Sequence, residues 1–327
     1  MKAFAGPCKL ASTALLALSF MANAAAQSYP NHTVRIVVPF PGGSVVDTYT
    51  RLLGEAMRPV LGDAPVLVEP RPGAGTEIGT KYVISQPADG YTLLMATSSL
   101  AIKSAQFKPP FDARKDFVGV GLLTDSPLFL VCNSTLPFKT AKDVVEYAKA
   151  NPNKLNLVNY GVGTLGHLTG ELLMYKAGAK AVPIAFNGSV NAALAVSQGN
   201  GDCGFNVLTS FSAFIQQGRV KVLAASSVKR DPLNPDVPGM AESGITGVDV
   251  SSWGGVVAPT GTPRDAVQKL NAALDVAMKA PAVRAHFKNV GLGLEQGVST
   301  PEQFTQQINS NVDDFYKLIR AANLQFD

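Results

Sequence analysis

A glycine-rich segment in the middle of the chain has residues suited to binding a small anion. It reads Gly161-Val162-Gly163-Thr164-Leu165-Gly166 and lies between an apolar run and a segment with helical spacing. Glycines at such a junction let backbone N–H groups face a ligand, and the positive end of the helix attracts negative charge. His167 is either a ligand contact or a helix histidine bonded within its own element. We predict Gly161, Gly163, Thr164 and His167 as ligand-binding residues.

The same segment matches the G-x-G-x-x-G pattern of dinucleotide-binding folds, but the rest of that motif is missing. The pattern requires an Asp or Glu about 20 residues further on, where it binds the ribose. That place reads Phe186-Asn187-Gly188 and contains no acid. We therefore expect no dinucleotide cofactor, and only the general affinity of a helix N-terminus for anions remains.

A second candidate loop precedes another predicted helix, nearer the start of the chain. It reads Phe40-Pro41-Gly42-Gly43-Ser44, and Asp47 follows in a variant of the capping-box pattern. It is not a P-loop, because no Gly-Lys-Ser/Thr follows. It is not a nucleophile elbow either, because the glycine that this motif requires after the serine is absent. The segment is either a ligand-binding loop or a tight strand-to-helix turn. All five loop residues and Asp47 are candidates for ligand binding.

Further polar residues follow other predicted strands. Ser98, Asn187 and Asn206 each come at or just after the end of an apolar run. In an α/β fold these positions share one edge of a sheet, where ligands usually bind, although each residue could equally be an ordinary cap. We include all three among the ligand-binding candidates.

The chain offers little for catalysis or metal binding. No Ser-His-acid order stands out, and no carboxylate pair is placed to tune its pKa values apart. The three histidines are scattered and no C-x-x-C pair exists, so we expect no metal site. Cys132 and Cys203 each lie inside an apolar run, where they could form a disulfide or remain buried thiols. These absences disfavour an enzyme without excluding one, because catalytic triads are assembled in space, and we expect no cofactor.

Strand-like and helix-like segments alternate along the chain, which predicts an α/β fold with mostly parallel sheets covered by helices. The length of 327 residues favours two sheets over one. The predicted strands are 34–38, 66–68, 91–96, 128–131, 155–159, 182–186, 203–206, 220–224 and 255–258. The predicted helices are 44–60, 76–86, 140–150, 164–177, 190–198, 210–217, 264–279, 281–290 and 301–322.

The charge of the chain argues against one class of protein, and its first residues indicate export. Charged residues make up 16% of the chain and the formal net charge is +4, which argues against a nucleic-acid binder. Lys2 and Lys9 lie before or at the start of an apolar run that ends at Met21, and small residues follow up to Ala26. This layout is typical of a signal peptide with cleavage near Ala26. Its removal leaves a net charge of +2.

With these segments in place, the chain resembles the Bug family, the TctC-like periplasmic solute-binding proteins of tripartite tricarboxylate transporters. The similarity covers nearly all of the chain after the signal peptide. It is carried by Tyr29-Pro30, Arg35 to Gly43, Asp47, Val68 to Gly75, Ala88 to Leu94, Tyr160 to Leu168, Val222 to Ala224, Asp236 to Pro238, Ala241 to Gly244, Trp253 to Gly255, Ala258 to Pro263 and Lys269 to Asn271.

The resemblance implies a two-domain type II periplasmic-binding-protein fold that closes on its ligand. One domain would comprise residues 27–127 and 251–327, and the other residues 128–250. The ligand implied is a small organic carboxylate (di-, tri- or aromatic), held by Gly163, Thr164 and their neighbours and met across the cleft by Phe40 to Gly43. The partners implied are membrane permease subunits, with the receptor itself a monomer without enzymatic activity.

Two positions depart from the family pattern. Asn187 stands where the family commonly has lysine, and Asn206 stands where it often has aspartate, so the ligand of a relative cannot be transferred to this chain. Two other functions stay open at this point. An exported α/β hydrolase would convert its ligand, and a ligand-sensing subunit would serve a sensor kinase.

Overall fold

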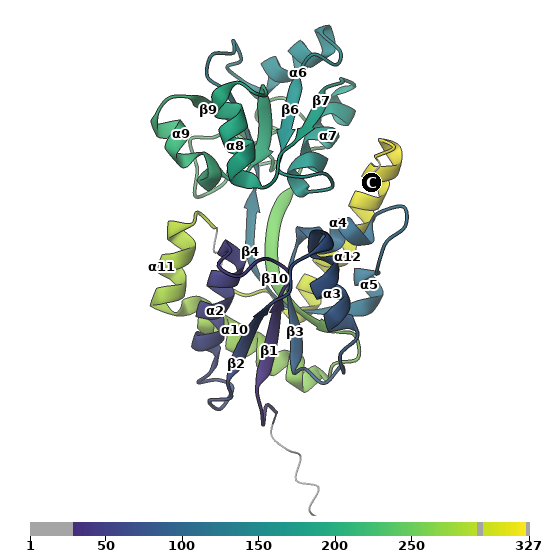
Figure 1. The fold of residues 1–327 in the computed structure, drawn as a ribbon, viewed down its shortest axis with the longest axis vertical. Coiled ribbons are helices and arrows are strands. Elements are labelled where there is room, and N and C mark those ends of the chain that lie inside the picture. Colours follow the sequence, from purple (N-terminus) through teal and green to yellow (C-terminus); the bar gives the residue numbers. More distant parts are fainter. Residues whose placement is uncertain (1–28, 293–296, 325–327) are drawn as a thin grey trace, which may run out of the picture.

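The computed structural model describes residues 29–292 and 297–324, so the predicted signal peptide, residues 1–26, lies outside the described residues. Within them the strands form two five-stranded sheets (Figure 1). The first sheet has the order β2 (Val66–Pro70), β1 (Val34–Val38), β3 (Thr92–Thr97), β10 (Ser251–Pro259) and β4 (Phe117–Pro127). The second has the order β7 (Val182–Ala185), β6 (Asn156–Asn159), β8 (Cys203–Asn206), β5 (Phe129–Asn133) and β9 (Val220–Ala225).

The two sheets are mixed, each with one strand that runs against the other four. In the first sheet β10 is antiparallel to both of its neighbours, and in the second sheet β5 is. β4 leads directly through Leu128 into β5, which carries the chain from one sheet to the other. β1 and β3 therefore point towards the second sheet, while β6 and β8 point back towards the first. The carboxyl ends of these strands face each other (Figure 1).

Helices cover both sheets, and all but two of them, those at residues 98–104 and 113–116, correspond to predicted helices. They are α2 (Val45–Met57), α3 (Glu77–Ile84), α4 (Ser98–Ser104), α5 (Ala113–Asp116), α6 (Ala141–Ala150), α7 (Leu165–Ala177), α8 (Ser189–Gln198), α9 (Ser212–Gln216), α10 (Arg264–Lys279), α11 (Pro281–Asn289) and α12 (Pro301–Ala321), with short 3-10 turns η1 (Ala74–Thr76) and η2 (Leu208–Phe211). Capping decides several starts. Thr140 and Thr300 both form full capping boxes, with Asp143 and Gln303.

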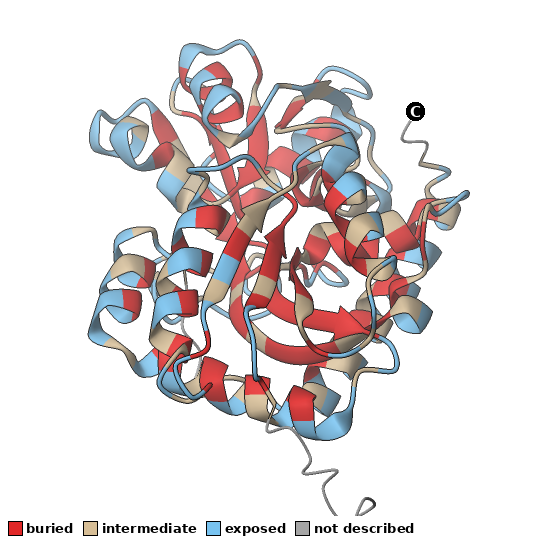
Figure 2. Cartoon of the chain, turned by 60° about the horizontal axis from the view of Figure 1, so that its bottom comes forward, coloured by how far each residue is buried: buried red, intermediate tan, exposed pale blue. Residues whose placement is uncertain are grey.

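Most strands form the buried centre of each domain, while the edge strand β7 is largely exposed, and the helices expose their outer faces (Figure 2). One apolar cluster crosses from the first sheet to the second. It contains Leu94 of β3 and Leu130 of β5, together with Trp253 of β10. The Trp253 ring is 1% exposed and packs edge-on against Phe304 of α12, with ring centroids 5.4 Å apart. The two domains therefore share a continuous core near the crossing strands.

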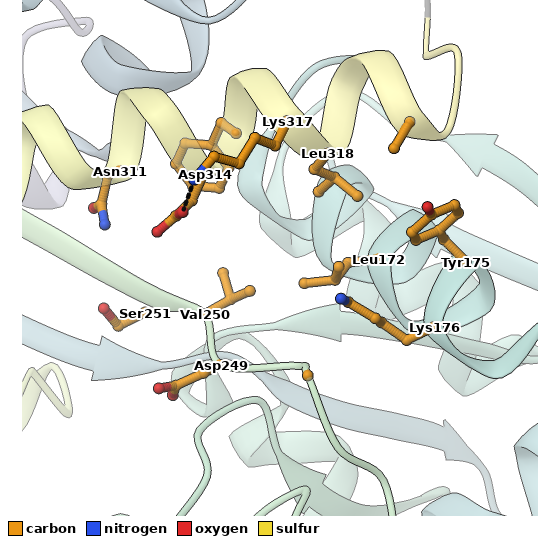
Figure 3. A pocket seen from close by; sticks show the side chains of 13 residues that line it. Leu172, Tyr175, Lys176, Asp249, Val250, Ser251, Asn311, Asp314, Lys317 and Leu318 are labelled. Carbon is orange, nitrogen blue, oxygen red and sulfur yellow. Dashed lines mark ion pairs between the residues drawn. The ribbon is translucent and has the colours of Figure 1, made fainter.

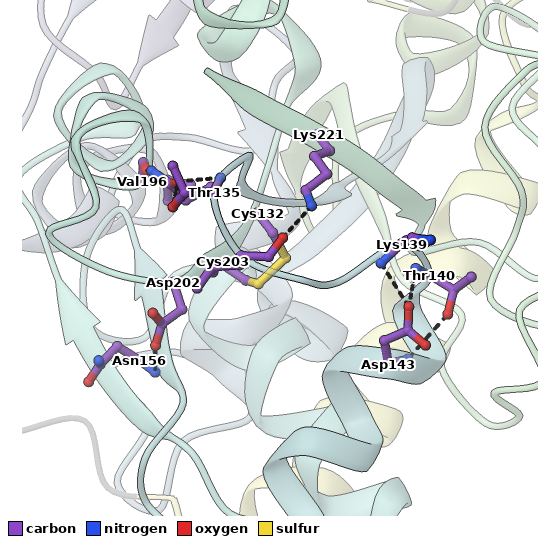
Figure 4. The surroundings of a disulfide bond; sticks show 12 residues. Cys132, Thr135, Lys139, Thr140, Asp143, Asn156, Val196, Asp202, Cys203 and Lys221 are labelled. Atoms are coloured by element: carbon purple, nitrogen blue, oxygen red, sulfur yellow. Dashed lines mark hydrogen bonds between the residues drawn. A yellow bond between two sulfur atoms is a disulfide. The ribbon is translucent and has the colours of Figure 1, made fainter. Parts of the chain in front are cut away.

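The two buried cysteines form a disulfide (Figure 4). Cys132 of β5 lies directly opposite Cys203 of β8, and neither side chain is exposed. The sequence alone left buried thiols open as an alternative, because spacing within each apolar run says nothing about which strands become neighbours. Strand pairing in the second sheet decides between the alternatives.

Two sequence predictions need correction. No strand was predicted between residues 100 and 127, yet β4 occupies eleven residues there. Its glycines hide the pattern and are needed for packing, since a Cβ on Gly119 would lie 2.8 Å from the backbone nitrogen of Thr305 in α12. Residues 97–99 were predicted as a loop end, but α4 begins at Ser98.

None of the helices in the described residues is long and apolar enough to cross a membrane.

Candidate functional site

The loop between β6 and α7 is closed by its own hydrogen bonds. Gly161 and Gly163 have φ values of 144° and 72°, a conformation that favours glycine. Thr164 is the N-cap of α7, and its hydroxyl donates to the carbonyl of Gly161 at 2.7 Å. The hydroxyl of Tyr160 accepts a hydrogen bond from the backbone N–H of Gly166 at 3.0 Å. These bonds preorganise the loop at the start of the helix.

His167 is bonded to the same loop. Its Nδ1 accepts a hydrogen bond from the backbone N–H of Gly163 at 3.1 Å, so the ring proton lies on Nε2, which is 3.8 Å from a carboxylate oxygen of Glu171. Burial lowers the pKa of His167 and raises the pKa of Glu171. The ring is therefore neutral at pH 7, and the histidine supports the loop from within α7. Its predicted contact with a ligand stays a prediction.

The two asparagines predicted from sequence have different surroundings. Asn206 is 2% exposed; its Nδ2 donates to the carbonyl of Ser189 at 3.0 Å, and its Oδ1 accepts from the N–H of Val207 at 2.9 Å. The side chain thus holds the start of α8 against β8 and does not face solvent. Asn187 is exposed and directly precedes Gly188, the N-cap of α8. Asn187 is thus the more accessible of the two, and the predicted contacts of both asparagines with a ligand stay predictions.

The starts of α7 and α8 lie side by side and carry backbone donors that the protein does not use. The N–H of Gly188 donates to the carbonyl of Tyr160 at 3.3 Å, which joins the two loops. Within residues 29–292 and 297–324, no hydrogen-bond acceptor contacts the backbone N–H groups of Val162, Leu165, Ser189 or Val190. Neither helix has an acidic residue in its first turn. Two positive helix ends therefore converge on one place without an internal anion.

The amino end of α2, in the first domain, is already occupied by the carboxylate of Asp47. That side chain accepts hydrogen bonds from the N–H of Gly43 at 2.9 Å and from Arg51 at 3.0 and 3.1 Å. Burial by itself would raise the pKa of Asp47, but the bonds from Arg51 and Gly43 outweigh it and lower the pKa. Ser44 caps the helix as predicted, accepting from the N–H of Asp47 at 3.2 Å. In a full capping box the Asp47 carboxylate would also accept from the N–H of Ser44. Here it accepts from the N–H of Gly43 instead.

The remaining loop residues of the first domain differ in exposure. Pro41, Gly42 and Gly43 are exposed, while Phe40 is partly buried against the core of the first domain. These residues lie at the carboxyl end of β1, the edge that faces the second sheet. They can therefore approach a ligand held by the second domain if the domains close.

Ser98 has a structural partner at the crossing between domains. Its side chain is 3% exposed, accepts a hydrogen bond from the N–H of Trp253 at 3.0 Å and donates to the carbonyl of Ser251 at 3.4 Å. The serine thus ties the start of α4 to the start of β10. Its predicted role in ligand binding stays a prediction.

The predicted residues therefore form two groups on facing edges. The first domain contributes Phe40 to Ser44, Asp47 and Ser98, and the second contributes Gly161, Gly163, Thr164, His167, Asn187 and Asn206. Sequence reasoning missed Tyr160 and the open N–H groups of α8. A tyrosine just before a glycine loop gave no signal, because its bond to Gly166 depends on how α7 folds back.

A cavity of about 460 Å³ lies away from these loops, between the two domains (Figure 3). Its walls come from the second half of α7, from α12 and from residues 247–251, and they contain none of the predicted site residues. The charged groups on it have both signs, including the Asp314–Lys317 pair, whose nitrogen and oxygen are 3.7 Å apart. Because the walls belong to both domains, the width of this cavity depends on the angle between them.

Comparison with known proteins agrees with this architecture. Residues 49–324 match the family model described as the tripartite tricarboxylate transporter family receptor. The chain is 33% identical over 294 residues to a protein encoded in the tcbD–tcbE intergenic region of Pseudomonas sp. strain P51, covering 89% of this chain and 87% of that protein.

Solved structures give the same result. The periplasmic binding protein BugD has 32% identity and a TM-score of 0.74, and the match covers 91% of this chain and 99% of BugD. MatC from Rhodopseudomonas palustris, solved with bound malate, has 29% identity and a TM-score of 0.74, with coverage of 89% and 100%.

Proposed function

The chain belongs to the tripartite tricarboxylate transporter receptor family, a family of substrate-binding proteins and not of enzymes, and we propose that it captures a small organic carboxylate in the periplasm. One observation carries the proposal: the amino ends of α7 and α8 converge, with backbone N–H groups that have no acceptor among the described residues. Such donors bind small anionic groups, of which the carboxylate is the one found in a ligand of a relative, the malate bound to MatC.

The ligand carboxylate binds to the second domain first. The amino end of α2 in the first domain already holds the charge of Asp47, whereas the amino ends of α7 and α8 hold none. The loop from Phe40 to Gly43 then closes over the bound ligand. We place the domain boundaries at residues 127/128 and 250/251, where the chain crosses between the sheets.

Closure links capture to transport. A ligand that contacts both domains favours the closed arrangement, because only that arrangement makes both sets of contacts. The closed protein then presents one combined surface to the permease subunits of a tripartite tricarboxylate transporter. Malate bound to MatC, a relative of the same fold, supports a carboxylate as the ligand.

A thermal-shift screen of the chain without its first 26 residues tests this function. The panel contains monocarboxylates, dicarboxylates and tricarboxylates, with sugars and amines of similar size as controls. A ligand at 100 times its dissociation constant adds about 2.7 kcal/mol to the free energy of unfolding. We expect at least one carboxylate to raise the melting temperature and to be recovered unchanged. A response to sugars or amines alone would contradict the proposal.

A further inference from the structure

We propose that Gly291 of the first domain and Thr209 of the second form the contact that fixes how far the two domains close on a ligand. The proposal rests on the proposed function above, because it assigns two positioning residues to the same closure. Neither residue belongs to the loops predicted to bind the ligand. Both act through the distance that they set between those loops.

One partner of this contact has no side chain, and the other fills the space that a side chain would need. A Cβ atom on Gly291 would lie 2.7 Å from the Cγ2 methyl of Thr209, well below the roughly 3.5–4.0 Å at which two carbon atoms attract each other. Gly291 also has a φ of 64°, a conformation that favours glycine. The contact joins the end of α11 to η2, which leads into α9, and α11 lies below α9 in Figure 1.

Thr209 is held rigidly with the proposed carboxylate site of the second domain. It is the second residue of η2, which follows β8 at the edge that faces the first sheet. Phe211 of η2 is 1% exposed and belongs to the same apolar cluster as Ala192 and Ala193 of α8. Because such a core is close-packed, η2 and the amino end of α8 move together.

Gly291 is joined in the same way to the candidate ligand loop of the first domain. Its N–H donates to the carbonyl of Lys288 at 3.2 Å, which ties it to the last turn of α11. Phe287 of α11 is fully buried, and its ring centroid lies 5.2 Å from that of Tyr49 in α2. α2 in turn begins directly after the loop from Phe40 to Ser44. The position of Gly291 is therefore fixed relative to that loop.

The contact limits closure and does not drive it. A single methyl group against a glycine gains very little dispersion energy, and none of the hydrogen bonds or ion pairs within residues 29–292 and 297–324 joins Thr209 to Gly291. Closure therefore depends on the ligand, and the contact sets where it ends. A larger side chain at position 291 would hold the facing edges apart and cost the ligand its contacts with one domain.

Cysteine cross-linking tests whether the ligand brings the two residues together. In the double variant Thr209→Cys, Gly291→Cys the sulfur at position 209 can take the place of the methyl group, which brings a disulfide within reach. We expect oxidised glutathione to form this bond, and the best carboxylate of the thermal-shift screen to speed its formation severalfold. The pair Thr209→Cys, Gly178→Cys is the control that should not cross-link. A missing cross-link, or a rate that does not respond to the carboxylate, overturns the inference.

Titration calorimetry with the same carboxylate identifies the obstructing atoms. Gly291→Ala should weaken binding severalfold, because Thr209 is β-branched and its methyl group has little freedom to turn away. Thr209→Ser removes only that methyl group, so adding Gly291→Ala to Thr209→Ser should cost almost no further affinity. The backbone strain of the substitution at position 291 is the same in both backgrounds, and the recovery therefore belongs to the methyl group.

A second glycine controls for the backbone strain. Gly178 has a φ of 63° and no atom of another segment within 4 Å of its Cβ position, so Gly178→Ala brings the same strain without an obstruction and should leave affinity unchanged. Equal losses for Gly291→Ala in both backgrounds, or no loss in either, overturn the inference and leave the proposed function intact. Failure of every carboxylate to bind wild type overturns the proposed function, and the inference with it.

Discussion

The Nδ1 atom of His167 accepts a hydrogen bond from the backbone N–H of Gly163 at 3.1 Å, and this bond fixes the glycine loop to the first turn of α7. One of the loop's N–H groups is therefore used inside the protein. The donors that remain open for a ligand are those of the flanking residues Val162 and Leu165. The histidine acts as a support for the site, which makes its effect on binding indirect and testable.

Replacing His167 should weaken ligand binding through the loop. In His167→Leu the N–H of Gly163 loses its acceptor, and a lost hydrogen bond of this kind costs roughly 1 kcal/mol, or about fivefold in affinity. In His167→Asn the side-chain oxygen lies near the former Nδ1 position and should restore most of the affinity. Titration calorimetry with the best carboxylate of the screen measures both. Equal affinities for wild type and His167→Leu would contradict the supporting role.

The same histidine should make stability depend on pH. Burial lowers the pKa of His167 in the folded protein below its usual value of 6.5, so the unfolded chain binds the proton first as the pH falls. The contribution of the neutral ring is present above about pH 6.5, and it is lost as the pH falls from there towards the folded pKa. Urea unfolding at pH 8, 7, 6 and 5 should show a smaller decrease for His167→Asn than for wild type. Identical decreases would rule out this origin.

Deleting one backbone donor of α8 should weaken carboxylate binding. Ser189 is the first residue of α8, a position where proline fits a helix and removes only an unused N–H. We expect Ser189→Pro to lower affinity severalfold while the protein remains folded, and Ser189→Ala, which keeps the N–H, to bind like wild type. Calorimetry on the two variants gives the comparison. If both bind equally well, the amino end of α8 does not hold the carboxylate.

The two asparagines should separate stability from binding. Asn206→Ala removes two buried hydrogen bonds and leaves the N–H of Val207 without its acceptor, which should cost about 1–3 kcal/mol of unfolding free energy. Asn187→Ala changes an exposed side chain and should leave stability within about 0.5 kcal/mol of wild type. Urea denaturation measures both variants. A larger loss for Asn187→Ala than for Asn206→Ala would contradict the structural assignment.

The disulfide should contribute to stability and not to ligand binding. It joins residues 71 positions apart, and the chain-entropy estimate for such a loop is roughly 4 kcal/mol. The double variant Cys132→Ala, Cys203→Ala should therefore have a free energy of unfolding about 2–4 kcal/mol lower than that of the oxidised wild type. Urea denaturation measures the difference. Its carboxylate affinity should be unchanged, because neither cysteine lies in the facing loops. Unchanged unfolding would show that the bond is absent from the folded protein.

Local features of this chain could be predicted from its sequence. The bounds of β8, Cys203–Asn206, and of α10, Arg264–Lys279, match the prediction residue for residue. Thr140 and Ser44 cap helices as expected. These features depend on residues within about four positions of one another, where periodicity, capping and glycine conformation act. The glycine loop before α7 and the resemblance to a receptor family belong to the same local and ordered information.

Which groups meet was decided only by the tertiary structure. Asn206 is bonded to Ser189, 17 residues earlier, and Ser98 to Trp253, 155 residues later, so two predicted ligand contacts are engaged inside the protein. Cys132 meets Cys203 because β5 enters the second sheet antiparallel to β8. A polar side chain in a sequence has the same donors and acceptors wherever it lies. Whether they remain open to a ligand depends on strand pairing and helix packing, which bring distant residues into contact.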